Sequence, residues 1–278
     1  MLNLSKVKFS KKDHVKKIRL PKRISSELAY LIGIHLGDGS MVYDAKRHDS
    51  WISYSGNLTE EYDWYINYLK PLIKKLFNIN VSIVEDKRVG HSMIRIYFRS
   101  KAILLFLHKT VDLPLGNKKN CHIPKTIMKA NDVIKRSFLR GLADTEFCIY
   151  FLDKRKVGKN HYPIISYRTS NAELTKEIDI LFKKFGFKTY SRFNFKVKRN
   201  NKMFTASEIY LNGKDNLMRW MKVIGFSSPK HLTKYKIWKK FGYCPSYTTL
   251  IQRNKILNGK LKLSQVVKGA LVQSSNKQ

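Results

Sequence analysis

Acidic residues are scarce in this sequence. It contains 20 Asp and Glu against 55 Lys and Arg, so its formal net charge at pH 7 is +35. An excess of this size makes a compact chain repel itself unless a polyanion neutralises it. Nucleic acid is the polyanion that we expect, because each phosphate neutralised by a cation releases counterions. A basic composition inherited from an AT-rich genome is the alternative explanation of the charge.

Cysteines and long apolar stretches are also few. Cys121, Cys148 and Cys244 are an odd number at wide spacing, which fits neither a disulfide framework nor a zinc site. No stretch reaches the roughly 18–20 apolar residues of a membrane span, and residues 1–17 lack the apolar core of a signal peptide. We therefore expect an intracellular protein, in the cytoplasm, the nucleoid or an organelle matrix, that is not secreted.

The 278 residues divide into two copies of one α+β unit. We expect a basic arm over residues 1–24, a first repeat over 25–130, a second repeat over 131–242, and a tail of unknown role over 243–278. LIKKLFNINV at 72–81 resembles LFKKFGFKTY at 181–190, and RIYFRSKAILLFL at 95–107 resembles EIYLNGKDNLMRW at 208–220. A period of about 110 residues indicates a duplicated unit and not a solenoid.

The same order of elements is predicted in both repeats. The first predicted helix begins at a Ser25 or Ser26 cap and ends at Gly39. Further helices are predicted over residues 59–77, with a break near Pro71, and over 101–110, 132–147 and 172–185. Another begins at about residue 214, and the tail holds a predicted helix over 261–271. The predicted strands cover residues 51–55, 81–86, 92–98, 149–155, 162–168, 189–198 and 204–211, with turns at Gly90 and Gly158. Residues 43–49 are predicted to form a loop.

Two predicted strands alternate apolar and polar residues. The inward sets are Ile94, Ile96 and Phe98 in one strand, and Phe193, Phe195 and Val197 in the other. The outward sets are Arg95, Tyr97 and Arg99, and Arg192, Asn194, Lys196 and Lys198. This period of two predicts antiparallel sheets with one covered face. The outward side chains suit phosphates and base edges, so we predict that they bind DNA; an ordinary solvated face is the alternative.

Two nine-residue segments combine small residues with a terminal acid. They read LIGIHLGDG at 31–39 and LRGLADTEF at 139–147. Their third and seventh places hold Gly33 and Gly37 in the first segment, and Gly141 and Thr145 in the second. Residues four apart share one face of a helix, and small residues there let two helices approach closely. Each helix then ends in a carboxylate, Asp38 or Glu146, beside the negative end of its dipole. If the two helices pack side by side, their carboxylates also repel each other. A divalent cation held by both carboxylates would offset the dipole and this repulsion, and hard oxygen ligands favour Mg²⁺.

These segments resemble the motif of the LAGLIDADG homing endonucleases. The second segment keeps Leu139, Gly141, Leu142, Asp144 and an acid at the eighth place, and the first keeps Leu31, Gly33, Asp38 and Gly39. The resemblance extends over roughly residues 25–240, because the same element order follows each motif. Phe147 departs from the pattern, since it replaces the terminal glycine of the second motif.

The resemblance implies a fold and an activity. Each αββαββα repeat would form a curved four-stranded antiparallel sheet, with the motif helices packed at the centre. Asp38 and Glu146 would be the catalytic residues, binding Mg²⁺ or Mn²⁺ and directing water onto one phosphodiester of each strand to leave short 3′ overhangs. A chain with two motifs would be a monomer that reads a long asymmetric site in double-stranded DNA. The family also places a basic residue near the metals, for which Arg95, Arg168 and Lys154 are candidates.

Other residues and other functions remain open. We interpret Asp144 as structural and His35 as a packing residue of the motif helix. Without a Cys or Ser at residue 1 and a terminal His-Asn pair, the chain does not match an intact intein, and we expect a free-standing, intron-encoded enzyme. The alternatives on the same scaffold are an RNA maturase, a DNA-binding regulator that does not cut, and a decayed inactive copy.

Overall fold

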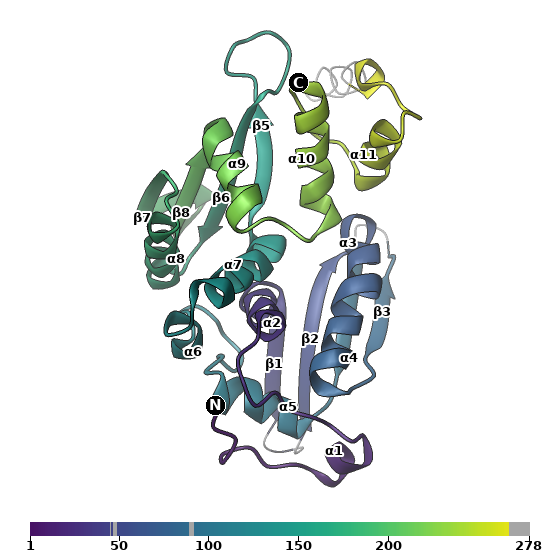
Figure 1. Cartoon of the computed structure of the whole chain (residues 1–278), viewed down its shortest axis with the longest axis vertical. Coiled ribbons are helices and arrows are strands. Elements are labelled where there is room, and N and C mark those ends of the chain that lie inside the picture. Colours follow the sequence, from purple (N-terminus) through teal and green to yellow (C-terminus); the bar gives the residue numbers. More distant parts are fainter. Residues whose placement is uncertain (45, 47–48, 89–91, 267–278) are drawn as a thin grey trace.

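The chain folds into two four-stranded antiparallel sheets, each covered by helices (Figure 1). A computed structural model describes residues 1–44, 46, 49–88 and 92–266. The predicted turn at Gly90 therefore lies outside the described residues, as do residues 267–271 of the helix predicted over 261–271, of which residues 263–266 are helical. Within these limits the predicted α+β fold of two tandem repeats is confirmed.

The two sheets have the same topology. The first contains β1 (Gly39–Asp44), β2 (Asp49–Asn57), β3 (Ser82–Asp86) and β4 (Met93–Phe98) in the order β1-β2-β4-β3. The second contains β5 (Cys148–Leu152), β6 (Tyr162–Thr169), β7 (Thr189–Arg199) and β8 (Lys202–Asn212) in the order β5-β6-β8-β7. All neighbouring strands are antiparallel. Matching strand orders are what a duplicated unit requires.

Helices cover one face of each sheet (Figure 1). The first repeat contains α2 (Ser26–Gly37), then α3 (Leu58–Trp64), the π-helical turn η1 (Tyr65–Leu69) and α4 (Lys70–Phe77) in one continuous rod, and α5 (Lys101–Leu105) with η2 (Phe106–Thr110). The second contains α7 (Asp132–Glu146), α8 (Ala172–Lys184) and α9 (Gly213–Val223). The short helices α1 (Lys11–Val15) and α6 (Lys125–Met128), and the C-terminal α10 (Pro229–Phe241) and α11 (Leu250–Leu257), complete the described chain.

Two sequence predictions about strands are wrong. Gly39 was expected to end a helix before a loop, but it begins β1, which pairs with β2 from Gly39 opposite Tyr54 onward. In β7 the strict alternation fails at a bulge between Arg192 and Phe195, where Asn194 has a φ of 53°. Phe193 is 37% exposed instead of buried. The extra residue also inverts the alternation beyond it, so Phe195 lies on the side of Arg192, whereas Lys196 and Lys198 lie on the other side, contrary to the prediction. In β4, by contrast, Ile94, Ile96 and Phe98 are buried as predicted.

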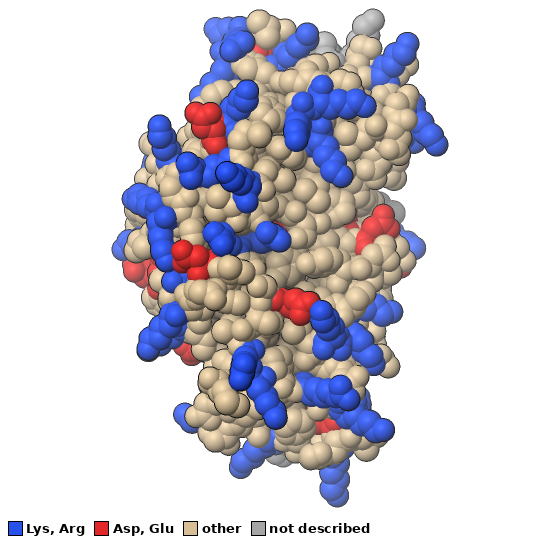
Figure 2. Space-filling model, viewed as in Figure 1, with Lys and Arg blue, Asp and Glu red and all other residues tan. Residues whose placement is uncertain are grey.

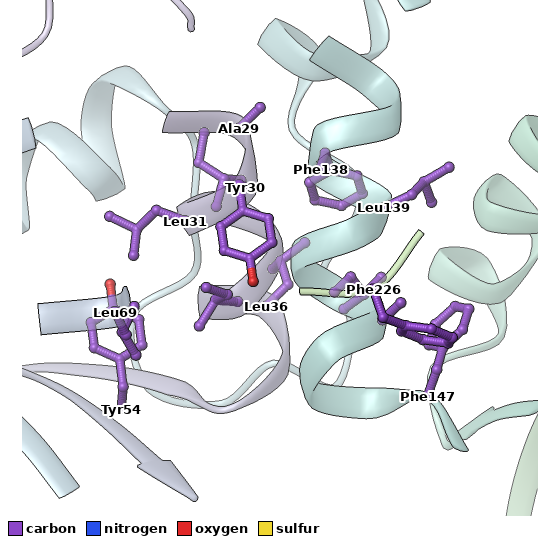
Figure 3. Packing of buried hydrophobic residues seen from close by; sticks show 14 of the residues in the cluster. Ala29, Tyr30, Leu31, Leu36, Tyr54, Leu69, Phe138, Leu139, Phe147 and Phe226 are labelled. Carbon is purple, nitrogen blue, oxygen red and sulfur yellow. The ribbon is translucent and has the colours of Figure 1, made fainter. Parts of the chain in front are cut away.

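The two repeats meet where α2 packs against α7 so closely that the glycines between the helices have no space for a Cβ atom. A Cβ atom on Gly33 would lie 2.1 Å from the backbone oxygen of Phe138, and one on Gly141 would lie 2.0 Å from the backbone oxygen of Tyr30. A Cβ atom on Gly37 would lie 2.1 Å from Oγ1 of Thr145. Figure 3 shows the apolar side chains around this contact, including Tyr30 and Leu36 of α2 and Phe138 and Leu139 of α7. The small residues therefore allow backbone-to-backbone packing.

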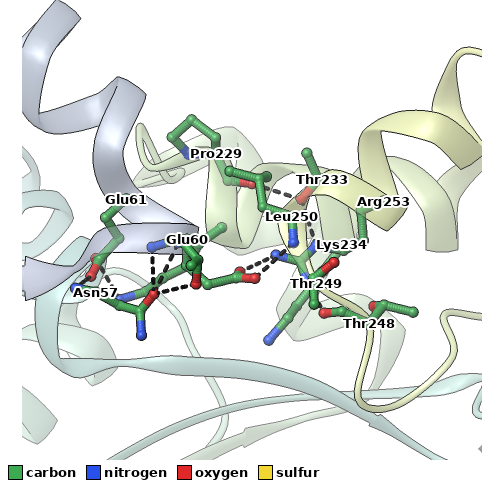
Figure 4. A network of polar contacts seen from close by, with 12 residues as sticks. Asn57, Glu60, Glu61, Pro229, Thr233, Lys234, Thr248, Thr249, Leu250 and Arg253 are labelled. Atoms are coloured by element: carbon green, nitrogen blue, oxygen red, sulfur yellow. Dashed lines mark hydrogen bonds and ion pairs between the residues drawn. The ribbon is translucent and has the colours of Figure 1, made fainter. Parts of the chain in front are cut away.

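Both terminal segments pack onto the first repeat. In the N-terminal arm the buried Asp13 accepts hydrogen bonds from Oγ of Ser100 at 2.6 Å and from the backbone N of Ala102 at 3.2 Å. At the other end, the buried guanidinium of Arg253 in α11 forms an ion pair with Glu60 of α3 (Figure 4). The Glu60 carboxylate also accepts from the backbone N of Leu250 at 2.7 Å. The C-terminal helices thus connect the second repeat back to the first.

Among the described residues, no helix combines the length and the apolar character that a membrane span needs.

Candidate functional site

Two carboxylates meet where the motif helices end. Asp38 caps the C-terminus of α2, and Glu146 is the last residue of α7. The two acids are near enough for the charge of Glu146 to act on Asp38. Burial, reinforced by the negative charges of Glu61 and Glu146, raises the pKa of Asp38 to about 7. The side chain of Glu146 reaches solvent, yet protein atoms around its carboxylate still displace water and raise its pKa.

A lysine from the segment that joins the repeats lies at the same place. The ammonium group of Lys118 donates to the backbone oxygen of Gly37, and to that of Gly39 at 2.9 Å. These carbonyls lie at the negative end of the α2 dipole, where a cation is favoured. Burial lowers the pKa of Lys118, while the charges of Glu146 and Asp38 act in the opposite direction. Lys118 therefore fixes the end of α2 and supplies positive charge beside both acids.

A second lysine, Lys230 at the start of α10, also acts on both acids. Its positive charge opposes the rise in pKa of Asp38 and of Glu146. Its Nζ atom lies 2.7 Å from Oε1 of Glu61, which is buried in α3. The other oxygen of Glu61 accepts from the backbone N of Asn57 at 2.8 Å. The centre thus combines the acid pair with two lysines and a third carboxylate.

The third carboxylate makes the two halves of the centre different. Asn57 caps α3 and Asn171 caps α8, so these residues occupy equivalent places in the repeats. Four residues later the first repeat has Glu61 and the second has the neutral Thr175, whose hydroxyl donates to the backbone oxygen of Asn171 at 2.7 Å. Extra negative charge therefore lies on the Asp38 side of the centre only.

An open cavity adjoins the other acid. It has a volume of about 390 Å³ and is lined by Gly37, Lys118 and Glu146 together with Tyr167 and Asn171 from the second repeat. Asn171 donates from Nδ2 to the backbone oxygen of Cys121 at 2.7 Å, and this bond ties the segment that joins the repeats to the second repeat. The cavity gives a charged group, such as a phosphate, access to both Lys118 and Glu146.

The other polar residues of the motif helices have structural contacts. Oδ2 of the fully buried Asp144 accepts from the hydroxyl of Tyr30 at 2.5 Å, and its oxygens accept from the backbone N atoms of Ser227 and Ser228 at 3.0 Å. Asp144 thus links α2, α7 and the segment that enters α10. His35 is buried beside the hydroxyl of Tyr54 at 3.3 Å, and burial lowers its pKa to about 3. A neutral, packed imidazole is what these contacts indicate.

The three basic candidates from the sequence have other surroundings. Arg95 lies on the exposed face of the first sheet, where Nε donates to Oγ of Ser55 at 3.2 Å. Arg168 donates from Nε to Glu208 at 2.8 Å. Lys154 follows β5, and its ammonium lies 3.6 Å from the centre of the Tyr162 ring. Lys118 and Lys230 are instead the cations that act on Asp38 and Glu146.

Sequence reasoning missed both lysines, although a signal was present. Lys118 follows the last predicted helix of the first repeat, and Lys230 lies beyond the last helix predicted in the second. Their numbers differ by 112 (230 − 118), which matches the repeat period of about 110 residues. Applying the repeat register to the basic residues would have paired them.

Four of the predicted DNA-binding residues, Arg95, Tyr97, Arg99 and Arg192, lie on the helix-free faces of the sheets. Arg95, Tyr97 and Arg99 line a hollow of about 410 Å³ on the first sheet, together with Asp44 and Asp49. On the second sheet Arg192 and Arg168 share the buried carboxylate of Glu208. Lys196 and Lys198 pair with Thr205 and Met203, so they point to the other side of the β7–β8 hairpin, where Lys196 donates to Oγ1 of Thr205 at 3.2 Å. Both lysines and Asn194 are exposed. The helix-free faces of both sheets therefore present arginines, and the end of the β7–β8 hairpin presents two lysines on its other side.

The acid pair offers a suitable donor set for a divalent cation. Carboxylate oxygens are hard ligands, and the raised pKa of each acid shows that negative charge is disfavoured there without a cation. The described part of the chain has no group of three or more His, Cys, Asp and Glu side chains arranged to hold a metal. Asp38 and Glu146 would therefore bind a cation together with oxygens that are not side-chain carboxylates, such as water or phosphate.

Comparisons with known proteins bear on the fold. No family model matches the sequence, and no curated protein matches it either. Among solved structures, one of mesophilic variants of the homing endonuclease I-DmoI has a TM-score of 0.51 at 15% identity, covering 73% of this chain and 91% of that chain. An I-SmaMI variant has a TM-score of 0.51 at 13% identity, covering 87% and 98%. I-DmoI in complex with DNA and Ca has a TM-score of 0.50 at 15% identity, covering 73% and 91%. The chain therefore has the two-repeat α+β fold of the LAGLIDADG homing endonucleases, whose motif its sequence resembles.

Proposed function

We propose that this chain is a site-specific endonuclease that cuts double-stranded DNA with Mg²⁺ or Mn²⁺ and leaves short 3′ overhangs. The observation that carries the proposal is the meeting of Asp38 and Glu146, one from each repeat, at the ends of helices packed backbone to backbone. Folding alone does not favour two carboxylates there, as their raised pKa values indicate. A catalytic role for the pair accounts for that cost.

The residues of the centre have distinct tasks in this proposal. Asp38 and Glu146 hold the divalent cations, which stabilise the attacking and leaving oxygens of a phosphodiester. Lys118 lies beside both acids with its ammonium fixed by the carbonyls of Gly37 and Gly39, so it can neutralise charge on the phosphate that is cut. Lys230, held by Glu61, acts in the same way from the second repeat. The backbone-to-backbone packing of α2 against α7 holds Asp38 and Glu146 in fixed positions relative to each other.

The sheets supply the DNA-binding surface in this proposal. Their helix-free faces carry Arg95, Arg99 and Arg192, and the exposed Lys196 and Lys198 project from the β7–β8 hairpin; all five suit phosphates and base edges. The likeness to I-DmoI, which has been crystallised in complex with DNA and Ca, supports this assignment. Because the repeats differ in sequence, the chain would read an asymmetric duplex site as a monomer. We place this activity inside the cell, in an intron-encoded enzyme.

The proposal can be tested without knowing the target. Purified protein is incubated with a randomised duplex library and Mg²⁺, and the cut ends are sequenced. We expect one long site, cut on both strands with a 3′ stagger. The variants Asp38→Asn and Glu146→Gln should bind this site but leave it uncut, whereas Asp63→Asn, an exposed acid of α3, should cut it normally. Binding without cutting by the wild-type protein would refute the nuclease and favour a regulator or a maturase.

A further inference from the structure

A second large groove lies far from the acid pair, on the helical side of the second repeat. It is formed by the loop between β5 and β6, the start of α9 and the end of α10, and its volume is about 790 Å³. A neighbouring hollow of about 1060 Å³ continues along α9 and shares Tyr162, Lys214 and Met218 with it. We call the 790 Å³ part the α9–α10 groove.

The α9–α10 groove is lined by cations without any acid. Its charged side chains are Lys154, Arg155, Lys159, Lys214 and Lys239, and neither Asp nor Glu lines it. In the described part of the chain, none of the five forms an ion pair with a carboxylate. Figure 2 shows the same face of the molecule as Figure 1, with many blue side chains and few red ones over α9 and α10. The groove therefore presents uncompensated positive charge in a concave site.

Aromatic rings stand among these cations. Tyr162, Trp238, Phe241 and Tyr243 line the groove. The ammonium of Lys159 lies 5.6 Å from the centre of the Tyr243 ring, and that of Lys240 lies 5.2 Å from the centre of the exposed Phe241 ring. Aromatic rings and backbone-tracking cations together are the features on which unpaired bases stack while their phosphates are neutralised.

The wall of the groove is held in place by specific contacts. Oxygens of Asp153 accept from the backbone N atoms of Val157 at 3.1 Å and Gly158 at 2.6 Å, which closes the β5–β6 loop on itself. Nε1 of Trp238 donates to the backbone oxygen of His161 at 2.7 Å, which ties the loop to α10. The groove is thus a defined surface and not a chance approach of two mobile segments.

The groove is distinct from the sheet face that we assign to duplex DNA. On β6 only Tyr162 and Pro163, at the start of the strand, line the groove, whereas Arg168 lies near the other end of the strand on the helix-free face, five residues after Pro163. Residues an odd number apart on a strand point to opposite faces. The helices α9 and α10 lie over the face that Pro163 shares (Figure 1). A straight duplex bound across the helix-free faces would leave the groove unoccupied.

We propose that the α9–α10 groove is a binding site for single-stranded nucleic acid, separate from the duplex site. A concave site between a loop and two helix ends suits a flexible strand with unstacked bases better than a rigid duplex. The cations neutralise the phosphates, and Phe241 and Tyr243 provide rings on which bases stack. The site goes beyond the proposed nuclease activity, and does not depend on it.

Fluorescence anisotropy with labelled oligouridylate and oligothymidylate tests the proposal across a salt series. The variant Lys159→Ala/Lys239→Ala should bind both more weakly, and its salt slope should fall by about 1.4, twice the 0.7 expected for each phosphate contact. Lys8→Ala/Lys12→Ala removes the same charge from exposed sites in the N-terminal arm and is the matched control. Tyr243→Leu leaves the charge unchanged and should weaken binding about fivefold or more.

Photocrosslinking locates the bound strand independently of these affinities. A 4-thiouridine oligonucleotide should crosslink to the peptide containing Phe241 and Tyr243. The relative affinities for oligouridylate and oligothymidylate then show whether the site prefers RNA or DNA. Equal losses in the groove variant and the arm control, or crosslinks confined to β4 and β7, would overturn the proposal. Circular dichroism of each variant shows whether a loss of binding reflects a loss of structure, and the Tyr243→Leu result tests the groove even if the double variant is unstable.

Discussion

Replacing Gly141 by Ala should weaken the protein even though alanine favours helices. The added Cβ atom would lie 2.0 Å from the backbone oxygen of Tyr30, whereas ordinary contact begins at 3.4 Å. The helices α2 and α7 must therefore separate by about 1.4 Å at this point (3.4 − 2.0). Because the opposing atoms belong to the backbone, no side-chain rotation can relieve the overlap.

The size of the effect follows from two opposing contributions. Overpacking of a dense interface costs about 1–3 kcal/mol, while the exchange of glycine for alanine within a helix returns about 1 kcal/mol. Because the overlap involves backbone, we expect the upper end of that cost, and a net loss of about 2 kcal/mol in the free energy of unfolding. Catalysis should suffer more, since a misplacement of about 1 Å at the acid pair can cost roughly 100-fold in rate.

Urea denaturation and plasmid cleavage measure the two effects. Val133→Ala is the control, because Val133 is exposed on the same helix and its replacement should change stability by less than about 0.5 kcal/mol. Gly37→Ala offers a contrast, because its Cβ atom would meet the side chain of Thr145 and the added change Thr145→Ala should relieve part of the damage. A Gly141→Ala protein that is as stable as the control would refute close backbone packing as the basis of the interface.

Four further outcomes are expected. Asp38→Asn should raise the free energy of unfolding in EDTA and abolish cleavage in Mg²⁺, because burial and two acidic neighbours disfavour its charge; a destabilised variant would contradict this. Glu61→Gln should raise the Mg²⁺ concentration for half-maximal cleavage, since it removes negative charge from the Asp38 side; an unchanged titration would show that Glu61 only anchors Lys230. Burial holds the pKa of His231 well below its usual value, so only the unfolded state takes up this proton as pH falls below about 6.5, and stability is lost there. His231→Phe should reduce that acid dependence in thermal unfolding, and an identical pH profile would argue against it. Lys196→Ala should lower the salt slope of duplex binding by about one unit if the lysine contacts a phosphate, and an unchanged slope would place the duplex elsewhere.

The parts of the fold that the sequence predicted depend on regular patterns. Small residues four apart predicted the contact between α2 and α7, and the alternation in residues 93–99 predicted which side of β4 is buried. The strand β1 was missed because it begins at Gly39, and a glycine after a helical pattern looks the same whether a loop or a strand follows. The bulge at Asn194 was missed because an alternating sequence carries no mark of an extra residue.

The candidate site was predictable only in part. Asp38 and Glu146 have identifiable places in a motif, so their meeting could be expected from the sequence. Lys118 comes from a linker and Lys230 from the first turn of α10, so their approach depends on tertiary packing that no local pattern records. The pairing of Lys230 with Glu61 joins residues 169 apart in sequence, and only the assembled repeats bring them together.

The contact of α11 with the first repeat has a consequence for the order of folding. Glu60 and Arg253 are 193 residues apart, and Leu250 reaches the same carboxylate across 190. During synthesis on the ribosome, α3 emerges long before its partner exists, and contacts of such range form slowly. This part of the first repeat therefore stays uncovered until α11 has been made. A chain that stops before α11 would leave Glu60 without these partners and expose the surface that α11 covers, and exposed surface of this kind favours aggregation.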